Sequence, residues 1–146
     1  MNIIRLRKIR RGDIPRIFKW RNDPSVRKNS FNTKIITWPQ HQKYWAGRFS
    51  HHPDYSYMIV CDGEGAGVVR LDDKKDGTYE VNILIAPDWQ GMGIGSIAIK
   101  ELRVLSKKLR IKKLVARMKP HNAASQSIFR KGGFREKYRF FWCDIS

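Results

Sequence analysis

A glycine-rich segment near the middle of the chain has the residue types and spacing of a phosphate-binding loop. It reads Gln90-Gly91-Met92-Gly93-Ile94-Gly95-Ser96, with three glycines at alternate positions. Glycine lets the backbone come close to a ligand, because no Cβ stands in the way. The hydrophobic period becomes helical at Ile94, so these amides should lie at a helix N-terminus, where unpaired N–H groups and the helix dipole favour an anion.

Two common nucleotide-binding patterns do not fit this segment. A P-loop needs Gly-Lys-Ser/Thr after its glycines, and no such triplet follows here. A dinucleotide-binding turn needs Gly-x-Gly-x-x-Gly after an opening strand, with an acidic residue about 20 positions further on. Here the spacing is Gly-x-Gly-x-Gly, the loop lies in mid-chain, and the residues after it are almost all basic. We therefore reject both patterns.

Hydrophobic periodicity places the loop between a strand and a long helix. Period-two alternation and turn signals predict strands, whereas apolar residues at three- and four-residue intervals predict helices. We expect strands at 2–8, 55–61, 67–71, 78–85, 113–118 and 134–143, and helices at 14–22, 37–49, 94–107 and 122–130. The order β-α-α-β-β-β-α-β-α-β, with an antiparallel meander at its centre, predicts an α+β fold. Since no repeats or linkers interrupt it, we expect residues 1–146 to form a single domain.

Composition argues against several classes of protein. The 146 residues are 41% hydrophobic and 12% aromatic, which is too much for a disordered basic tail. No apolar run approaches the roughly 18 residues of a membrane-spanning helix, and the first residues lack a signal-peptide pattern. Cys61 and Cys143 do not suggest a disulfide framework, and His41, His51 and His52 have no partners at metal-ligand spacing. We therefore expect a cytoplasmic protein with no metal site and no membrane partner.

Charge is the strongest compositional signal. The 30 Lys+Arg outnumber the 13 Asp+Glu, which gives a formal net charge of +17 and a pI near 10.3. Residues 1–30 hold ten basic side chains against two acidic ones, and residues 100–119 hold nine against one. Residues 51–90 hold three against eight, so the middle of the chain is acidic. This balance indicates an anionic partner without saying which kind.

Three features, in the same order, resemble the GCN5-related N-acetyltransferase (GNAT) superfamily. The segment 90–95 resembles the pyrophosphate-binding loop of that family, and the strand 80–85 followed by Pro87 is similar to its fourth strand. Downstream, the helix from Asn122 to Phe129, followed by Gly132-Gly133-Phe134, resembles its second cofactor motif. Together these features cover roughly residues 55–140. The first half of the chain fits the variable opening of the family, a strand and two helices.

The resemblance implies a fold, a cofactor and a set of contacts. The fold would be an α/β/α arrangement whose mixed, mostly antiparallel sheet has six to seven strands, splayed between the fourth and fifth, with about four helices. The cofactor would be acetyl-coenzyme A, with its pantetheine arm along the fourth strand, its pyrophosphate on the glycine loop and its 3′-phosphate near a basic residue. The implied cofactor residues are Ile83, Leu84, Ile85, Gln90, Gly91, Met92, Gly93, Ile94, Gly95, Ser96, Asn122, Phe129 and Lys131.

The same resemblance implies catalytic roles. Direct acetyl transfer to an amine needs a neutral amine and a proton for the leaving thiolate. Some members of the family have a catalytic glutamate on the fourth strand, where Glu80 stands, whereas others use a chain of waters, and both stay open here. The family's tyrosine falls at Phe129, which has no proton to give. Tyr138, Ser125 or a water would then replace it, or coenzyme A would leave as the thiolate.

The acceptor is usually set by the first two helices of this family. The segment Phe18-Lys19-Trp20-Arg21-Asn22-Asp23-Pro24-Ser25-Val26-Arg27 is similar to the opening helix of bacterial acetyltransferases that act on nucleotide-linked amino sugars, as in pseudaminic acid biosynthesis. It is more loosely similar to acetyltransferases of the ribosomal-protein N-terminal type. Trp20 would stack on a uracil or sugar, and Arg21 and Arg27, with Asn22 beside them, would bind a diphosphate. A core role for Trp20 and a solvated face for the arginines explain the same residues equally well.

The sequence thus favours acetyl transfer from acetyl-coenzyme A to the primary amine of a UDP-linked amino sugar, a small anionic acceptor. Acetylation of the N-terminus or a lysine of a ribosomal or other protein is the alternative within the family. A basic RNA- or ribosome-associated module is the alternative of another class, because such a charge gives non-specific, salt-dependent binding to nucleic acid in any case. We expect a monomer or homodimer.

Overall fold

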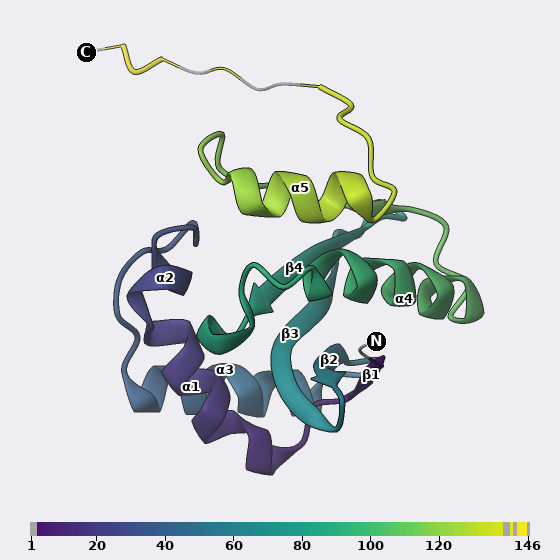
Figure 1. Cartoon of the computed structure of the whole chain (residues 1–146). Coiled ribbons are helices and arrows are strands. Elements are labelled where there is room, and N and C mark those ends of the chain that lie inside the picture. The colour runs from purple at the N-terminus through teal and green to yellow at the C-terminus, as the bar shows by residue number, and fades with distance from the viewer. Residues whose placement is uncertain (1–2, 139–140, 142, 146) are drawn as a thin grey trace.

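Five strands form one sheet in the computed structural model, which describes residues 3–138, 141 and 143–145 (Figure 1). The strands are β1 (Ile4–Lys8), β2 (Tyr55–Cys61), β3 (Glu64–Asp73), β4 (Tyr79–Ile85) and β5 (Leu114–Val115). They lie side by side in the order β1-β2-β3-β4-β5. The first four are antiparallel to their neighbours, and β5 runs parallel to β4.

Five α-helices and two short 3-10 helices connect and cover these strands in the described part of the chain. The helices are η1 (Arg11–Asp13), α1 (Ile14–Asn22), α2 (Pro24–Arg27), α3 (Trp38–Ser50), η2 (Pro87–Trp89), α4 (Ile94–Lys108) and α5 (Ala123–Lys131). Their start signals are local. Thr37 and Gln40 form a reciprocal capping box at the start of α3, and the Asp23 side chain accepts the N–H of Ser25 at the start of α2. No described helix is long and apolar enough to cross a membrane.

The helices cover both faces of the sheet, which gives an α/β/α arrangement (Figure 1). One core lies between the sheet and α4 with α5, and the other between the sheet and α1 with α3. Alternation along β2 divides its side chains between them: Tyr57 and Ile59 belong to the α4 side, Met58 to the α1 side. The same alternation puts Glu80, Asn82 and Leu84 of β4 on the α1 side, because Val81 and Ile83 pack on the other.

The structure corrects the expected sheet. Among the described residues the sheet has five strands rather than six to seven, and the strand expected at 113–118 pairs only at Leu114–Val115. The strand expected at 134–143 does not form at residues 134–138, 141 or 143, while 139, 140 and 142 lie outside the described residues. A two-residue β5 offers a further strand only a short ladder of backbone partners, so the alternating C-terminal sequence has little to pair with.

The helices differ less from expectation. The expected helices at 14–22, 37–49, 94–107 and 122–130 correspond to α1, α3, α4 and α5 within a residue or so at each end. The short helix α2 is additional. Asp23-Pro24 ends α1, as expected, and the same two residues then start α2, because proline suits the first turn of a helix and aspartate caps it.

Candidate functional site

The sheet opens between β4 and β5, which pair at only two positions. Tyr79 pairs with Leu114 and Glu80 with Val115, and the rest of β4 has no strand partner on that side within the described chain. The other edge of β4 is paired with β3 along its whole length. The free edge therefore suits an extended, amide-bearing chain that adds as a strand. The residues implied for the pantetheine arm lie in this stretch of β4: Ile83, Leu84 and Ile85.

The glycine-rich loop follows β4 and leads into α4. Gly91 and Gly93 each have a φ of 76°, in the left-handed region that favours glycine. Among the described residues, no acceptor is found for the N–H groups of 91–93, and those of 94–96 open α4, where a helix has no internal acceptor. A Cβ built on Gly91 or Gly93 would meet nothing within 4 Å. The loop therefore presents free donors and open space to an anion such as a diphosphate.

The remaining loop residues shape this surface rather than enlarge it. A Cβ on Gly95 would lie 2.7 and 2.9 Å from side-chain atoms of Ile128, so this glycine lets α5 pack closely on α4. Ile94 is buried in the core beneath the loop, and Met92 is exposed. The Ser96 hydroxyl donates to the carbonyl of Gly93 at 3.2 Å, which ties the first turn of α4 to the loop.

Gln90 joins the loop to the opening helices. Its Nε2 donates to the carbonyl of Ile85, at the end of β4, and to the hydroxyl of Ser25 in α2, both at 3.2 Å. The side chain therefore bridges the phosphate-binding loop and α2. Sequence spacing alone gave no indication of this link, because Ser25 and Gln90 are far apart in the chain.

The predicted cofactor residues of α5 lie at both ends of that helix. Asn122 is buried and its Oδ1 accepts the N–H of Ser125 at 3.0 Å, so its side chain caps the helix. Phe129 is buried in the core, with its ring edge-on to Phe134 at 5.0 Å between centroids. Lys131 is exposed at the opposite end of α5 from Asn122. Both ring and cap therefore have structural contacts in addition to any contact with a cofactor.

Glu80 is buried and paired with Arg117. Arg117 Nε and Nη2 donate to the two carboxylate oxygens at 2.8 and 3.0 Å, and Lys74 Nζ lies 3.7 Å from the same carboxylate. The hydrogen bonds from Arg117 outweigh burial and hold the pKa of Glu80 below its ordinary value. The carboxylate is thus ionised and already fully engaged by one guanidinium.

Tyr138, the other predicted catalytic residue, lies in neither a helix nor a strand. Its side chain is 78% exposed, and it has no hydrogen bond or ring contact with any described residue. The structure therefore does not bring Tyr138 into contact with Glu80 or with the glycine loop.

Three of the four predicted acceptor residues hold the segment 28–37, which connects α2 to α3. The Asn22 amide both donates to and accepts from the backbone of Ile36, each at 2.9 Å. Arg27 donates to the carbonyls of Asn22 and Thr33, and Arg21 Nη2 donates to the carbonyl of Asn32 at 2.8 Å. Trp20, the fourth, packs against the α1-side core with the guanidinium of Arg16 5.3 Å from its ring centroid.

Arg21 also has one guanidinium nitrogen that lacks a hydrogen-bond partner among the described residues. Its Nη1 is one of two buried side-chain nitrogen or oxygen atoms in the described chain that lack a hydrogen-bond partner. Burial lowers the pKa of Arg21, with repulsion from Arg27 adding to it. Arg70 of β3 lies close enough to be affected by Arg21: burial lowers the pKa of Arg70, Asp72 opposes that change, and Arg21 reinforces it. Two guanidinium groups thus share one partly buried region.

A polar surface on the α1 side of the sheet, which we call the acceptor face, is formed by Arg21, Arg70, Asp72, Glu80, Asn82 and Arg117. Sequence reasoning missed three of these residues: Arg70, Asp72 and Arg117. Arg70 pairs across the sheet with Asn82, and Asp72 with Glu80. Asp72 accepts from Asn82 at 2.7 Å and from Arg48 at 2.6 Å. Period-two alternation from Glu80 across the expected β3–β4 hairpin was the available signal. Arg117 had none, because it lies just beyond a strand too short to fix its direction.

The open edge of β4 and the loop of free amides before α4 together suit a linear, amide-bearing ligand that carries a diphosphate. The family model described as the acetyltransferase (GNAT) domain matches residues 4–135. The chain therefore belongs to the GNAT acetyltransferase family and is an acetyl-coenzyme A-dependent N-acetyltransferase. The free loop donors and the open edge of β4 fit this cofactor.

The chain is also similar to individual proteins, in sequence or in fold. The chain is 25% identical over 134 residues to spermidine N(1)-acetyltransferase of Escherichia coli K12, covering 90% of this chain and 72% of that protein. Among solved structures, a domain from Methanocaldococcus jannaschii has a TM-score of 0.83 at 23% identity, with coverage of 96% and 93%. The spermidine N-acetyltransferase of Vibrio cholerae, solved with CoA and spermine, also gives 0.83, at 20% identity and coverage of 94% and 86%.

Proposed function

We propose that this protein acetylates the primary amine of a UDP-linked amino sugar. The observation that carries the proposal is the buried Arg21 Nη1 without a partner, in the same region as Arg70. A buried, unpaired guanidinium nitrogen is costly, and an acceptor phosphate would satisfy it with a charge-assisted hydrogen bond. The proposal extends the family activity to an acceptor that carries its own negative charge.

The relatives named for spermidine act on a polycation, which this acceptor face does not suit. Arg21 and Arg70 present positive charge there, and Tyr44 lies under the Arg70 guanidinium at 5.2 Å from ring centroid to Cζ. Phe31 of the segment 28–37 supports Arg117 in the same way, also at 5.2 Å. Such aromatic contacts hold guanidinium groups in place without neutralising them. Because Glu80 is paired with Arg117 and Asp72 with Arg48, the charges of Arg21 and Arg70 remain in excess, which would repel a cationic acceptor and attract a diphosphate.

We further propose that the amine loses its proton through water rather than directly to Glu80. A general base works best with a pKa near the working pH, and Arg117 holds the pKa of Glu80 below its ordinary range. Bound acetyl-coenzyme A supplies the activated acetyl thioester. Glu80 and Arg117 then act on the acceptor side by orienting polar groups, while the open edge of β4 and the glycine loop hold the cofactor.

Of the described residues, neither Phe129 nor Tyr138 is placed to protonate the leaving thiolate. The Phe129 side chain has no acidic proton and lies in the core, and Tyr138 is exposed without contacts to described residues. We propose that water, or release of coenzyme A as the thiolate, replaces the family's tyrosine. In both cases the free N–H groups of the glycine loop bind the pyrophosphate of the cofactor.

A thiol-release assay with three acceptors tests the proposed acceptor. We expect turnover with a UDP-4-amino sugar, and far less with spermidine or with a basic N-terminal peptide. Arg70→Gln should raise the KM for the UDP-sugar by about tenfold or more, since a charge-assisted contact is lost, while leaving the KM for acetyl-coenzyme A unchanged. Lys19→Gln, which removes an exposed charge from α1, is the matched control and should change neither value.

Two results would contradict the proposal in different ways. Turnover with the peptide or spermidine alone would overturn the sugar acceptor and leave the acetyltransferase assignment intact. No change in melting temperature with acetyl-coenzyme A would count against the cofactor site itself and favour the basic RNA-associated alternative, because a ligand that binds the native state must stabilise it.

A further inference from the structure

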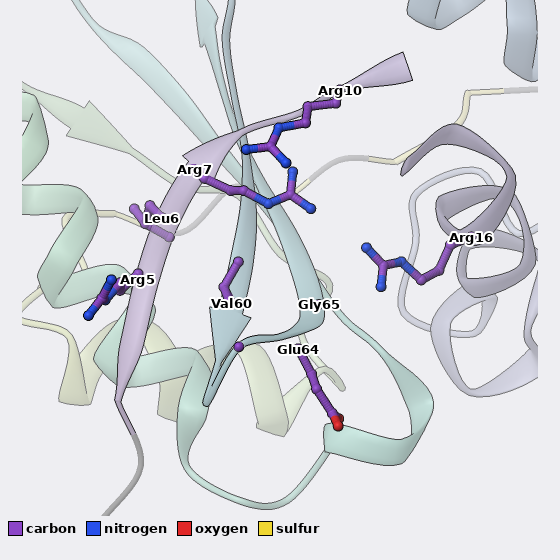
Figure 2. A pocket seen from close by; sticks show the side chains of 9 residues that line it. Arg5, Leu6, Arg7, Arg10, Arg16, Val60, Glu64 and Gly65 are labelled. Atoms are coloured by element: carbon purple, nitrogen blue, oxygen red, sulfur yellow. The ribbon is translucent and has the colours of Figure 1, made fainter. Parts of the chain in front are cut away.

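A cavity, which we call the arginine-lined cavity, lies between β1, the β2–β3 turn and the start of α1. It adjoins the end of β4, because the N–H of Ala86 donates to the carbonyl of Ala66, the residue after Gly65. Its volume is about 690 Å³, and none of the predicted cofactor or acceptor residues lines it. Four arginines do: Arg5, Arg7, Arg10 and Arg16. Figure 2 shows Arg7 and Arg10 on one side and Arg16 on the other, with their guanidinium groups turned toward the same space.

The charges around this cavity do not cancel. Arg7 donates to both oxygens of Asp13, at 2.8 and 2.9 Å, and Arg16 reaches the same carboxylate at 3.2 Å. Arg10 has no ion pair with any described residue. The four lining arginines, set against Asp13 and Glu64, leave two positive charges around the cavity. Glu64, which also lines the cavity, points away from Arg7 and Arg10 (Figure 2).

Arg16 is held in a fixed orientation on this wall. Its guanidinium lies against the backbone of Gly65, where a Cβ would come within 2.7 to 2.8 Å of three guanidinium atoms. The Trp20 ring lies 5.3 Å away, from centroid to Cζ. Glycine at this turn therefore makes room for the arginine, and the indole ring supports it. A guanidinium oriented in this way loses less side-chain entropy when it binds an anion.

We propose that this cavity is a binding site for a small phosphorylated anion that carries at least two negative charges. Planar guanidinium groups match phosphate oxygens in pairs, and two surplus positive charges match a phosphate dianion or a diphosphate. The volume lies within the range of small-ligand sites. The site is distinct from the predicted cofactor and acceptor sites in its residues, because none of its lining residues belongs to β4, the glycine loop or the acceptor face.

The position of the site links it to α1. Asp13 directly precedes α1, and Arg16 belongs to its first turn, while Trp20 and Arg21 lie further along the same helix. An anion on Arg10 and Arg16 would offset the repulsion among the guanidinium groups and so stabilise the start of α1. Binding should therefore be visible as increased protection of α1 amides, independently of any enzymatic activity.

Calorimetric titration with inorganic pyrophosphate tests the site in protein saturated with coenzyme A, at constant ionic strength. We expect saturable binding at one site, weakened about tenfold or more in the variant with Arg10→Gln and Arg16→Gln. Lys43→Gln, an exposed cation on α3, is the matched control and should bind pyrophosphate as the unchanged protein does. Equal weakening in the control would overturn the proposal, because the general positive field would then explain the binding.

A second variant keeps every charge and moves only one. Gly65→Ala should displace the Arg16 guanidinium and weaken pyrophosphate binding at unchanged net charge, since a flexible side-chain end can give way without loss of the fold. Full pyrophosphate affinity in Gly65→Ala would contradict the role of Arg16. Loss of binding once coenzyme A is saturating would assign the pyrophosphate to the cofactor loop instead. Citrate bound as tightly as pyrophosphate would overturn the assignment to a phosphorylated ligand.

Discussion

Glu80 owes its chemical character to the two hydrogen bonds that it accepts from Arg117. The carboxylate is buried, yet the pKa is lowered rather than raised, because a guanidinium on both oxygens outweighs the burial. The resemblance to the family identified Glu80 as a candidate catalytic residue on the fourth strand. It could not predict the partner, since Arg117 is 37 residues away and lies just beyond the short β5. The predicted residue is therefore present, but its partner makes it a weak base.

Replacing Glu80 by glutamine separates these roles. If water carries the proton, Glu80→Gln should lower kcat by no more than about tenfold, whereas loss of a general base costs about 10² to 10⁴. The alkaline and acid limbs of the kcat/KM profile should keep their positions. Steady-state rates across the pH range check this, and a loss of a thousandfold with a missing acid limb would contradict the water pathway.

The Glu80–Arg117 pair should also make stability depend on pH. Because the pKa of Glu80 is lower in the folded than in the unfolded chain, the pair stabilises fully above the ordinary glutamate value and loses its effect as pH falls through the folded value. Arg117→Gln should cost about 1 kcal/mol near neutral pH, a modest figure since Arg117 is largely exposed. The urea midpoints of the two proteins should converge at acid pH, once Glu80 is protonated in the folded state as well. An equal difference in urea midpoint between the two proteins at neutral and at acid pH would exclude the Glu80–Arg117 pair as its cause.

At the scale of elements, the loop before α4 contains glycines that are there for different reasons. Gly93 needs its left-handed φ and faces open space, whereas Gly95 has an ordinary φ and packs against Ile128. We expect Gly93→Ala to weaken acetyl-coenzyme A binding about tenfold or more, because the new Cβ stands on the ligand side and disturbs the free amides. Gly95→Ala should instead destabilise the α4–α5 packing by about 1 to 3 kcal/mol. Paired measurements of Kd and unfolding midpoint check both, and similar effects of the two changes on Kd would contradict the distinction.

Asn22 of α1 makes two of the hydrogen bonds that hold the segment 28–37. The Asn22 side-chain amide hydrogen-bonds to both the N–H and the C=O of Ile36, as a neighbouring backbone segment would. Asn22→Ala should therefore cost about 1 to 2 kcal/mol and increase amide exchange across 28–37. Asn22→Asp keeps the acceptor for the Ile36 N–H, so its stability and amide exchange should lie between those of the unchanged protein and of Asn22→Ala. Hydrogen exchange by mass spectrometry gives the readout, and unchanged exchange in Asn22→Ala would show that other contacts hold the segment.

Local patterns predicted most of the elements correctly, and pairings between distant segments account for the errors. Strands β2 to β4 were predictable, because alternation and Asp/Gly turns are short-range signals, and α4 was predictable from its apolar stripe. The strand expected at 134–143 rested on alternation alone. A strand also needs a partner edge, and β5 provides only Leu114–Val115. The hydrogen bonds of Asn22 and Arg27 to the protein backbone likewise depend on how the chain folds around α1 and α2, which short-range patterns do not show. Their role in binding an acceptor stays a prediction.

Across the whole molecule, the charge of +17 separates into regions with different partners. Arg21 and Arg70 lie on the acceptor face. Arg7, Arg10 and Arg16 line the arginine-lined cavity between β1 and α1. A third group lies at the far end of α4, where a cavity of about 1090 Å³ is lined by basic side chains that include Arg110, Lys112 and Lys113. The first two regions have oriented guanidinium groups, whereas the third is dominated by flexible, exposed cations that suit non-specific contact with a polyanion.

The third region should therefore account for much of any binding to nucleic acid. Each phosphate contact contributes about 0.7 to the slope of log affinity against log salt for a single strand. Replacing Arg110, Lys112 and Lys113 by glutamine should reduce that slope by about 2 for a single-stranded RNA of mixed sequence, while the Kd for acetyl-coenzyme A stays the same. Fluorescence anisotropy over a series of KCl concentrations measures the slope. The same slope in the triple variant would place the contacts elsewhere, and a weakened acetyl-coenzyme A Kd would show that this surface also attracts the cofactor.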